Sequence, residues 1–233
     1  MTVAVLSLLL IGLTLLLLGA IVWGLRQMVQ QQVIEPTFFW WITFGLVGWL
    51  ALVGLVAQSG FLLQFESLPP RMPFFVLAPA VILVFLLRHS AVQAWLQAVP
   101  LSYLLGIQSF RIVGELLLWG MAAQAALPER MTFEGWNFDI VMGLTAPLVA
   151  WGAARGRLGQ PLLVAWNLAG LVFLLVVASM GFLTMPSPLR VFVEDDVRYL
   201  ADFPWIWLPT FLVALGYYAH VFALWKLWRK PSL

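Results

Sequence analysis

The sequence predicts an all-α protein, specifically a polytopic membrane helix bundle, and three observations support this. Hydrophobic residues make up 63% of the 233 residues, charged residues only 9%, and the mean hydropathy is +0.99. Soluble domains carry about 25% charged residues. The apolar residues form continuous Leu-rich runs, whereas a membrane β-barrel needs alternating segments of about 10 residues. Backbone polar groups in such runs are satisfied within helices.

About seven apolar runs are candidates for membrane spans, because a hydrocarbon core needs about 20 apolar residues per helix. Charged, polar or proline residues bound each run, and the third and fifth runs are short. In chain order they are Thr2–Leu25, Phe38–Ala57, Pro73–Leu87, Leu101–Leu127, Ile140–Ala154, Leu162–Leu183 and Trp205–Leu227. No linker or soluble domain interrupts them, so we expect residues 1–233 to form a single integral-membrane domain.

The basic residues predict the orientation of these spans, since Lys and Arg are concentrated in cytoplasmic loops. One side would carry Arg26, Arg88, Arg155, Arg157, Lys226, Arg229 and Lys230, and the other Arg71, Arg130, Arg190 and Arg198. This bias predicts an external N-terminus and a cytoplasmic C-terminus. The first span has no preceding basic residue and no small-residue cleavage pattern, which indicates a retained helix rather than a signal peptide.

Small residues recur on two of the predicted spans, and prolines lie within or near the ends of three. Small side chains let membrane helices approach closely, so we interpret the stripes as packing, with oligomerisation as the alternative. The second span carries Gly45, Gly48, Ala51 and Gly54, the fifth carries Gly143, Ala146 and Ala150, and the prolines are Pro79, Pro147 and Pro209. Between the last two spans, residues 185–204 space apolar residues three or four apart, which predicts a helix lying flat on the outer surface.

A polar stripe on the fourth span is the main functional signal. Gln108, Arg111, Glu115 and Trp119 fall within about 80° of arc on a helix. A central Arg or acid costs at least about 2.5 kcal/mol to insert, whereas an Arg–Glu pair at i and i+4 can neutralise itself. We therefore expect this face to turn into the bundle.

Polar groups on other spans are predicted to lie at similar depths. Counting about 1.5 Å per residue from the cytoplasmic ends places them roughly 8 to 15 Å deep. The residues at these depths are Gln108, Arg111, Thr145, Asn167 and His220. If they converge, they form a pocket with Arg111 as the anion-binding group and Glu115 as its counter-ion or a proton carrier. The alternative is a structural ion pair, with Asn167 and His220 as ordinary packed, hydrogen-bonded side chains.

The connection PERMTFEGWNFDIVMGLTAP between the fourth and fifth spans is also unusual. Asp139 or Asn137 is placed to cap the fifth helix, whose positive dipole end faces outward. Glu134 and Gly135 predict a turn that folds back into the mouth of the bundle. There Glu134 would meet Arg130 or a ligand.

Several of these segments together resemble a family of small multi-pass bacterial membrane proteins of uncharacterised function. The segments are QSFRIVGE, MTFEGWNFDIVMGLTAP, WN in the sixth span, MPSPLR after it and FPWIWLP in the seventh. The resemblance covers roughly residues 100 to 222. It implies that Gln108, Arg111, Glu115, Glu134, Asn137, Asp139, Asn167 and His220 belong to the family pattern. It also implies a bacterial cytoplasmic (inner) membrane location, and it implies no activity.

No cofactor or metal is expected from the sequence. The chain has no cysteine and no lysine in the middle of a span, and its two histidines, His89 and His220, lie at different depths, which disfavours a bis-histidine haem. There is no HExxH or P-loop pattern and no metal-ligand spacing. The basic end KLWRKPSL is better explained as a topology anchor than as a nucleic-acid patch.

The sequence therefore favours a transporter or sensor that binds a small polar or anionic molecule in an intramembrane pocket. The ligand-binding residues expected are Arg111, Glu115, Gln108, Asn167, His220 and Glu134. One alternative is an enzyme that uses Glu115 or His220 as acid or base on a lipid-soluble substrate. Another is an accessory subunit of a membrane complex. The expected partners are the lipid bilayer and, as further options, a membrane-protein partner or a second copy of the chain, and no nucleic acid.

Overall fold

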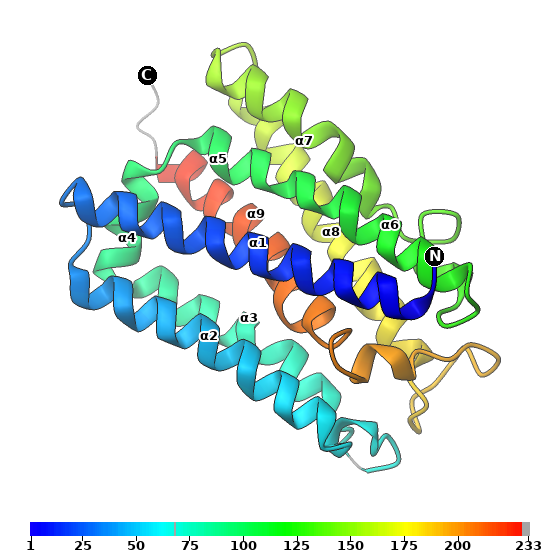
Figure 1. The fold of residues 1–233 in the computed structure, drawn as a ribbon. Coiled ribbons are helices and arrows are strands. Elements are labelled where there is room, and N and C mark those ends of the chain that lie inside the picture. Colours follow the sequence, from blue (N-terminus) through cyan, green and yellow to red (C-terminus); the bar gives the residue numbers. More distant parts are fainter. Residues whose placement is uncertain (68, 230–233) are drawn as a thin grey trace.

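A computed structural model describes residues 1–67 and 69–229, and this part of the chain is helical, without β-strands. Its helices lie side by side along one bundle (Figure 1). The α-helices are α1 (Val3–Gln30), α2 (Pro36–Gln58), α3 (Met72–Arg88), α4 (Ser90–Ala98), α5 (Leu101–Gly106), α6 (Phe110–Ala122), α7 (Asp139–Ala154), α8 (Gln160–Thr184) and α9 (Val213–Arg229). Shorter turns are η1 (Phe61–Leu63), η2 (Ile107–Ser109), η3 (Glu129–Met131), η4 (Arg198–Ala201) and a π-helical turn, η5 (Leu208–Leu212).

Five helical segments are long and apolar enough to cross a membrane, which indicates an integral membrane protein. They are α1, α2, the continuous segment Leu101–Ala122 formed by α5, η2 and α6, α8, and the segment Leu208–Arg229 formed by η5 and α9. The bent pair of α3 and α4 adds a sixth if it is one span, and α7 is shorter. The predicted count of seven crossings stays a prediction.

The last helix, α9, forms the centre of the bundle, with α1 and α2 at its periphery. In the most apolar window of the η5–α9 segment 61% of the residues are buried, against 17% for α2. Large apolar side chains on the peripheral helices, such as Leu16 and Phe44, are exposed. Such exposure is what contact with lipid requires, because hydrocarbon is as apolar as these side chains.

The third predicted span ends in a sharp bend that the sequence did not indicate. Between α3 and α4 the axis turns by 83°. At the bend, the His89 side chain accepts a hydrogen bond from the amide of Ala91, which begins α4. Lys226 of α9 donates to the carbonyls of Leu96 and Gln97 at the other end of α4. Because these carbonyls are the unpaired ones at a helix end, Lys226 anchors α4 across the end of the bundle.

Helix α7 begins deep inside the bundle. It packs antiparallel to α5 and α6, so that Ala150 lies against Gly106 and Gly143 lies against Ile112. Its 16 residues span only about 24 Å, less than a hydrocarbon core of about 30 Å. The loop before it, residues 128–138, fills the remaining depth, and Thr132 and Asn137 in this loop are buried. Irregular backbone at such depth is tolerated where protein surrounds it.

The surface helix expected at residues 185–204 is not formed. This segment is a loop with a single short turn, η4. Pro186 and Pro188 lack the amide hydrogens that a helix would use. The Arg190 guanidinium donates instead to the backbone carbonyls of Phe192 and Asp195. These bonds give the two carbonyls hydrogen-bond donors without a helix. The spacing of apolar residues alone therefore did not determine the local structure.

The apolar core consists of two clusters separated by buried polar residues. One cluster includes Leu6, Leu118 and Trp205, toward the end of the bundle where α1 begins, and the other includes Leu105, Leu163 and Phe222, toward the end where α9 finishes. Seven buried polar residues, six on helices and Asn137 in the loop before α7, lie between the two clusters. They are Gln108, Arg111, Glu115, Asn137, Asp139, Asn167 and His220. We call these seven residues the polar layer.

The two predicted small-residue stripes differ in their contacts. A Cβ added at Gly143 would lie 2.8 Å from the backbone nitrogen of Ile112, so this glycine permits the close approach of α7 to α6. A Cβ added at Gly45 or Gly48 on α2 would meet nothing within 4 Å, whereas one at Gly54 would meet the Phe203 ring. The stripe on α7 packs within the chain, and most of the stripe on α2 faces outward.

We predict that Gly143→Ala destabilises the protein whereas Gly48→Ala does not. The new methyl group at position 143 meets backbone, which cannot rotate away, so we expect a loss of about 1–3 kcal/mol, or roughly 2–4 °C in melting temperature per kcal/mol. Thermal unfolding of the detergent-purified protein measures this. Equal melting temperatures for the two variants would contradict the close packing of α6 and α7.

Candidate functional site

Arg111 of α6 lies at the centre of the polar layer. Its side chain is 3% exposed and rests against α9, where a Cβ added at Gly216 would lie 2.9 Å from its Nη2. The aliphatic part packs beside Gly143 of α7, where an added Cβ would lie 3.3 Å from the Cβ of Arg111. Two glycines on neighbouring helices thus leave room for the guanidinium in the bundle interior.

The charge partner of Arg111 is Asp139 and not the expected Glu115. Arg111 Nη1 lies 3.7 Å from Asp139 Oδ1, and no ion pair within 4.0 Å joins Arg111 to Glu115 in the part of the chain described. The distance to Asp139 exceeds the roughly 2.7–2.9 Å of a charged hydrogen bond. The pair therefore attracts through space without a direct hydrogen bond.

Glu115 is held by Asn137 from the buried loop. Asn137 Nδ2 donates to Glu115 Oε1 at 2.7 Å and to the Met131 carbonyl at 3.1 Å. Its Oδ1 accepts the backbone amide of Asp139 at 3.1 Å. Asn137, one of the two capping residues predicted, therefore bonds the first amide of α7 and links Glu115 to that helix end, although the N-cap position itself is Phe138. Asp139, the other, pairs with Arg111 instead.

Several buried polar atoms of this cluster have no hydrogen-bond partner among the described residues. They are Nε, Nη1 and Nη2 of Arg111, Oε2 of Glu115 and Oδ1 of Asp139. All three residues line a cavity of about 30 Å³, a volume that suits roughly one or two water-sized groups. Apolar side chains of α8 and η5, such as Leu174 and Leu208, line other parts of it. Unpaired donors and acceptors thus meet at one small space.

The wall formed by η5 is an irregular segment of the seventh predicted span. Its five residues form a π-helical turn that contains Pro209. Proline lacks an amide hydrogen, and π-helical turns occur often at functional sites. Leu208 and Leu212 of this turn, with Val213 after it, face the cavity. The backbone of the central helix is therefore locally loosened beside Arg111.

A second group of polar side chains joins η2, α8 and α9 next to Arg111. Gln108 Nε2 donates to the Gly216 carbonyl at 3.0 Å. His220 Nδ1 lies 2.9 Å from Asn167 Oδ1. The His220 ring packs under Gly170, where an added Cβ would collide with it, and lies edge-on to Trp166. The three predicted residues are buried and bonded to other helices, which is what a packing role requires.

The remaining predicted residues lie apart from the Arg111 cavity. The Thr145 hydroxyl accepts a hydrogen bond from the Trp166 indole at 3.0 Å. Trp119, expected to share the buried stripe, is 41% exposed and stacks on Phe133. Glu134 is exposed, and its predicted neighbour Arg130 pairs with Asp195 at 3.1 Å. The expected contact of Glu134 with Arg130 is therefore not made.

The sequence reasoning missed Asp139 as the acid that faces Arg111. Asp139 had been assigned to capping because it precedes an apolar run. The shortness of that apolar run could have identified Asp139. A run too short to cross the membrane is expected to start at mid-depth, which places the acidic residue at its start inside the bundle. Among the described residues, no group of three or more His, Cys, Asp or Glu could hold a metal ion.

A comparison with protein-family models matches residues 69–228 to a family described as Domain of unknown function (DUF8737). The chain belongs to this family. The matched DUF8737 region contains the whole polar layer, from Gln108 to His220, and begins after α2. The comparisons with curated proteins and with solved structures found no match. The site in the DUF8737 region is therefore interpreted from its own geometry.

We predict that Asn137→Ala strongly destabilises this DUF8737 protein. The substitution removes the bonds to Glu115, to the Met131 carbonyl and to the Asp139 amide, and each buried group left unpaired costs about 1–3 kcal/mol. The control is Glu134→Ala in the same loop, where the side chain is exposed. Thermal unfolding measures both, and a difference of less than about 1 kcal/mol would contradict the role of Asn137.

Proposed function

We propose that this protein binds a small anion, or a similarly small polar molecule, at Arg111 inside the membrane, as a transporter or a sensor. The observation that carries the proposal is a guanidinium 3% exposed whose three nitrogens have no hydrogen-bond partner in the described chain. An unpaired buried donor costs free energy, and a planar guanidinium matches carboxylate-like acceptors. A bound acceptor would supply the missing bonds.

The size of the cavity limits the ligand. About 30 Å³ accommodates one or two groups of the size of water. Formate, nitrate, bicarbonate or chloride are of the appropriate class, whereas a sugar or nucleotide would require the bundle to open. We therefore place the ligand among small inorganic or one-carbon anions and their neutral analogues.

Glu115 is proposed as a proton carrier. The cavity contains one guanidinium and two carboxyl groups, and Asp139 already pairs with the guanidinium. An anion next to two ionised carboxylates would be repelled. A proton on the unpartnered Oε2 of Glu115 would remove one negative charge and provide a donor to the anion. Anion binding and proton uptake would then occur together.

The proposed setting is a bacterial cytoplasmic membrane, crossed about seven times with the N-terminus outside. The distribution of basic residues supports this orientation. Lys226 and Arg229 contact α4 at one end of the bundle, and Arg130 and Arg190 contact Asp195 at the other. Figure 1 places the start of α1 and the end of α9 at opposite ends. A chain that crosses the membrane an odd number of times has its two ends on opposite sides.

The enzymatic alternative fits this geometry in only one of its two forms. It uses Glu115 or His220 as acid or base, and the residue used has to face the substrate. Glu115 lines the Arg111 cavity, whereas His220 is not among its lining residues and is bonded to Asn167.

The test is a thermal-stability screen of the detergent-purified protein with formate, nitrate, bicarbonate and chloride, and with formamide as the neutral analogue of formate. At 100 times Kd a ligand stabilises by about 2.7 kcal/mol, which is roughly 5–10 °C for a chain of this size. We expect at least one anion to raise the melting temperature and the double variant Arg111→Met with Asp139→Asn to lose that rise.

The double variant removes both charges together, so no buried ion is left unpaired. Arg155→Met, at the exposed end of α7, serves as the matched control and should keep the rise. An anion effect that persists in the double variant, or no anion effect beyond formamide, would overturn the proposal. Uptake of the stabilising anion into proteoliposomes then separates a transporter from a sensor.

A further inference from the structure

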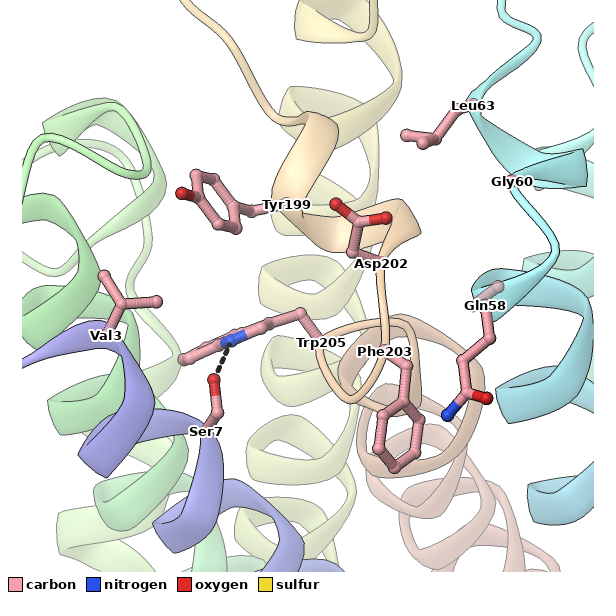
Figure 2. Close-up of a pocket in the computed structure, with 10 residues that line it drawn as sticks. Val3, Ser7, Gln58, Gly60, Leu63, Tyr199, Asp202, Phe203 and Trp205 are labelled. Carbon is pink, nitrogen blue, oxygen red and sulfur yellow. Dashed lines mark hydrogen bonds between the residues drawn. The ribbon is translucent and has the colours of Figure 1, made fainter.

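A larger cavity than the one at Arg111 lies at the outer end of the bundle. It has a volume of about 440 Å³ and is lined by the start of α1, the end of α2 and the segment around η4. Figure 2 shows it open between α1 and α2, with Asp202 and Tyr199 above the Trp205 indole in this view. Small-molecule sites commonly fall in the range of about 300–1,000 Å³. The cavity is therefore large enough for an organic ligand.

Asp202 is the only acidic residue among those lining this cavity. Its carboxylate makes no hydrogen bond or ion pair within the described chain, whereas the nearby Asp196 and Asp195 pair with Arg198 and Arg130. Burial raises the pKa of the Asp202 carboxyl. A cation in the cavity would favour the ionised form of this carboxyl.

Aromatic rings surround the same space. Tyr199 is half-exposed at its rim and Phe203 faces the end of α2, whereas Trp205 lies beneath them, buried in the core. The Trp205 indole is fixed, because its Nε1 donates to the Ser7 hydroxyl at 2.9 Å. Aromatic faces attract alkylated ammonium groups, and a carboxylate beside them adds charge attraction. No basic residue lines the cavity.

We propose that this outer cavity binds an ammonium group, with Asp202 as its charge partner and Tyr199 and Phe203 as its aromatic walls. The ammonium belongs either to a free amine such as choline or to the headgroup of an aminolipid, since the cavity opens at the outer ends of two peripheral helices. The site is separate from Arg111 and does not depend on the function proposed there.

The experiment measures the melting temperature of the detergent-purified protein with choline and with 3,3-dimethylbutanol, its neutral carbon isostere. Choline is expected to raise the melting temperature by a few degrees with saturation, and the isostere to have a markedly smaller effect. Asp202→Asn is expected to weaken choline binding at least about ten-fold, as loss of a hydrogen bond to a charged group does. This variant should fold, because it removes a carboxylate that lacks a partner.

Asp196→Asn on the same segment is the matched control and should bind choline normally. Tyr199→Leu provides a second variant at a half-exposed position and should weaken binding several-fold.

Nanodiscs distinguish a free amine from a lipid headgroup as the source of the ammonium. An aminolipid ligand predicts that phosphatidylethanolamine, and not phosphatidylglycerol, protects the protein and competes with choline. Equal effects of choline and its isostere, or unchanged choline binding in Asp202→Asn, would overturn the inference. The Arg111→Met and Asp139→Asn double variant should retain the choline effect, so failure of one proposal is distinguishable from failure of the other.

Discussion

The structure depends on the compensation of one guanidinium buried among apolar helices. A charge at this depth is expensive unless opposite charge and hydrogen-bonding groups come to it. Asp139 provides the charge, Gly216 and Gly143 provide the space, and two apolar clusters enclose the layer from either side. The three nitrogens of Arg111 nevertheless lack hydrogen-bond partners in the chain as described. The charge of Arg111 is therefore paired while its hydrogen bonds are incomplete, which is the combination that the proposed binding site needs.

This constraint explains why the fifth predicted span is short. Asp139 reaches Arg111 only because α7 begins in the bundle interior, and α7 can begin there only because the preceding loop is buried and bonded. Asn137 holds this buried loop in place. Its side chain forms hydrogen bonds with Glu115, with the Met131 carbonyl and with the first amide of α7. The Arg130 guanidinium lies 3.9 Å from the centre of the Phe192 ring and also pairs with Asp195. The loop that carries Asn137 is thus attached to the loop between α8 and η5.

The sequence predicted the helical class and the burial of Gln108, Arg111, Glu115, Asn167 and His220, because helix periodicity and the cost of buried charge are both local arguments. It did not predict which acid faces Arg111. Glu115 is four residues from Arg111 on the same helix, and side chains at this spacing are neighbours, so the sequence favoured Glu115 as the partner. The contact with Asp139 depends instead on how α6 and α7 pack. The loop at residues 185–204 was mistaken for a helix for a related reason, since the bonds of Arg190 to backbone carbonyls are not encoded in apolar spacing. The exposure of Glu134 likewise follows from the path of the loop and not from its turn residues.

The most direct test of the central claim is a double-mutant cycle between Arg111 and Asp139, with Arg111→Met and Asp139→Asn made singly and together. Each single variant leaves one buried charge unpaired, whereas the double variant leaves none, so the account predicts a coupling free energy of about 1–3 kcal/mol in reversible unfolding from detergent. The parallel cycle between Arg111 and Glu115→Gln should give a clearly smaller value. Additive effects for Arg111 and Asp139, within about 0.5 kcal/mol, or a larger coupling to Glu115, would contradict the account.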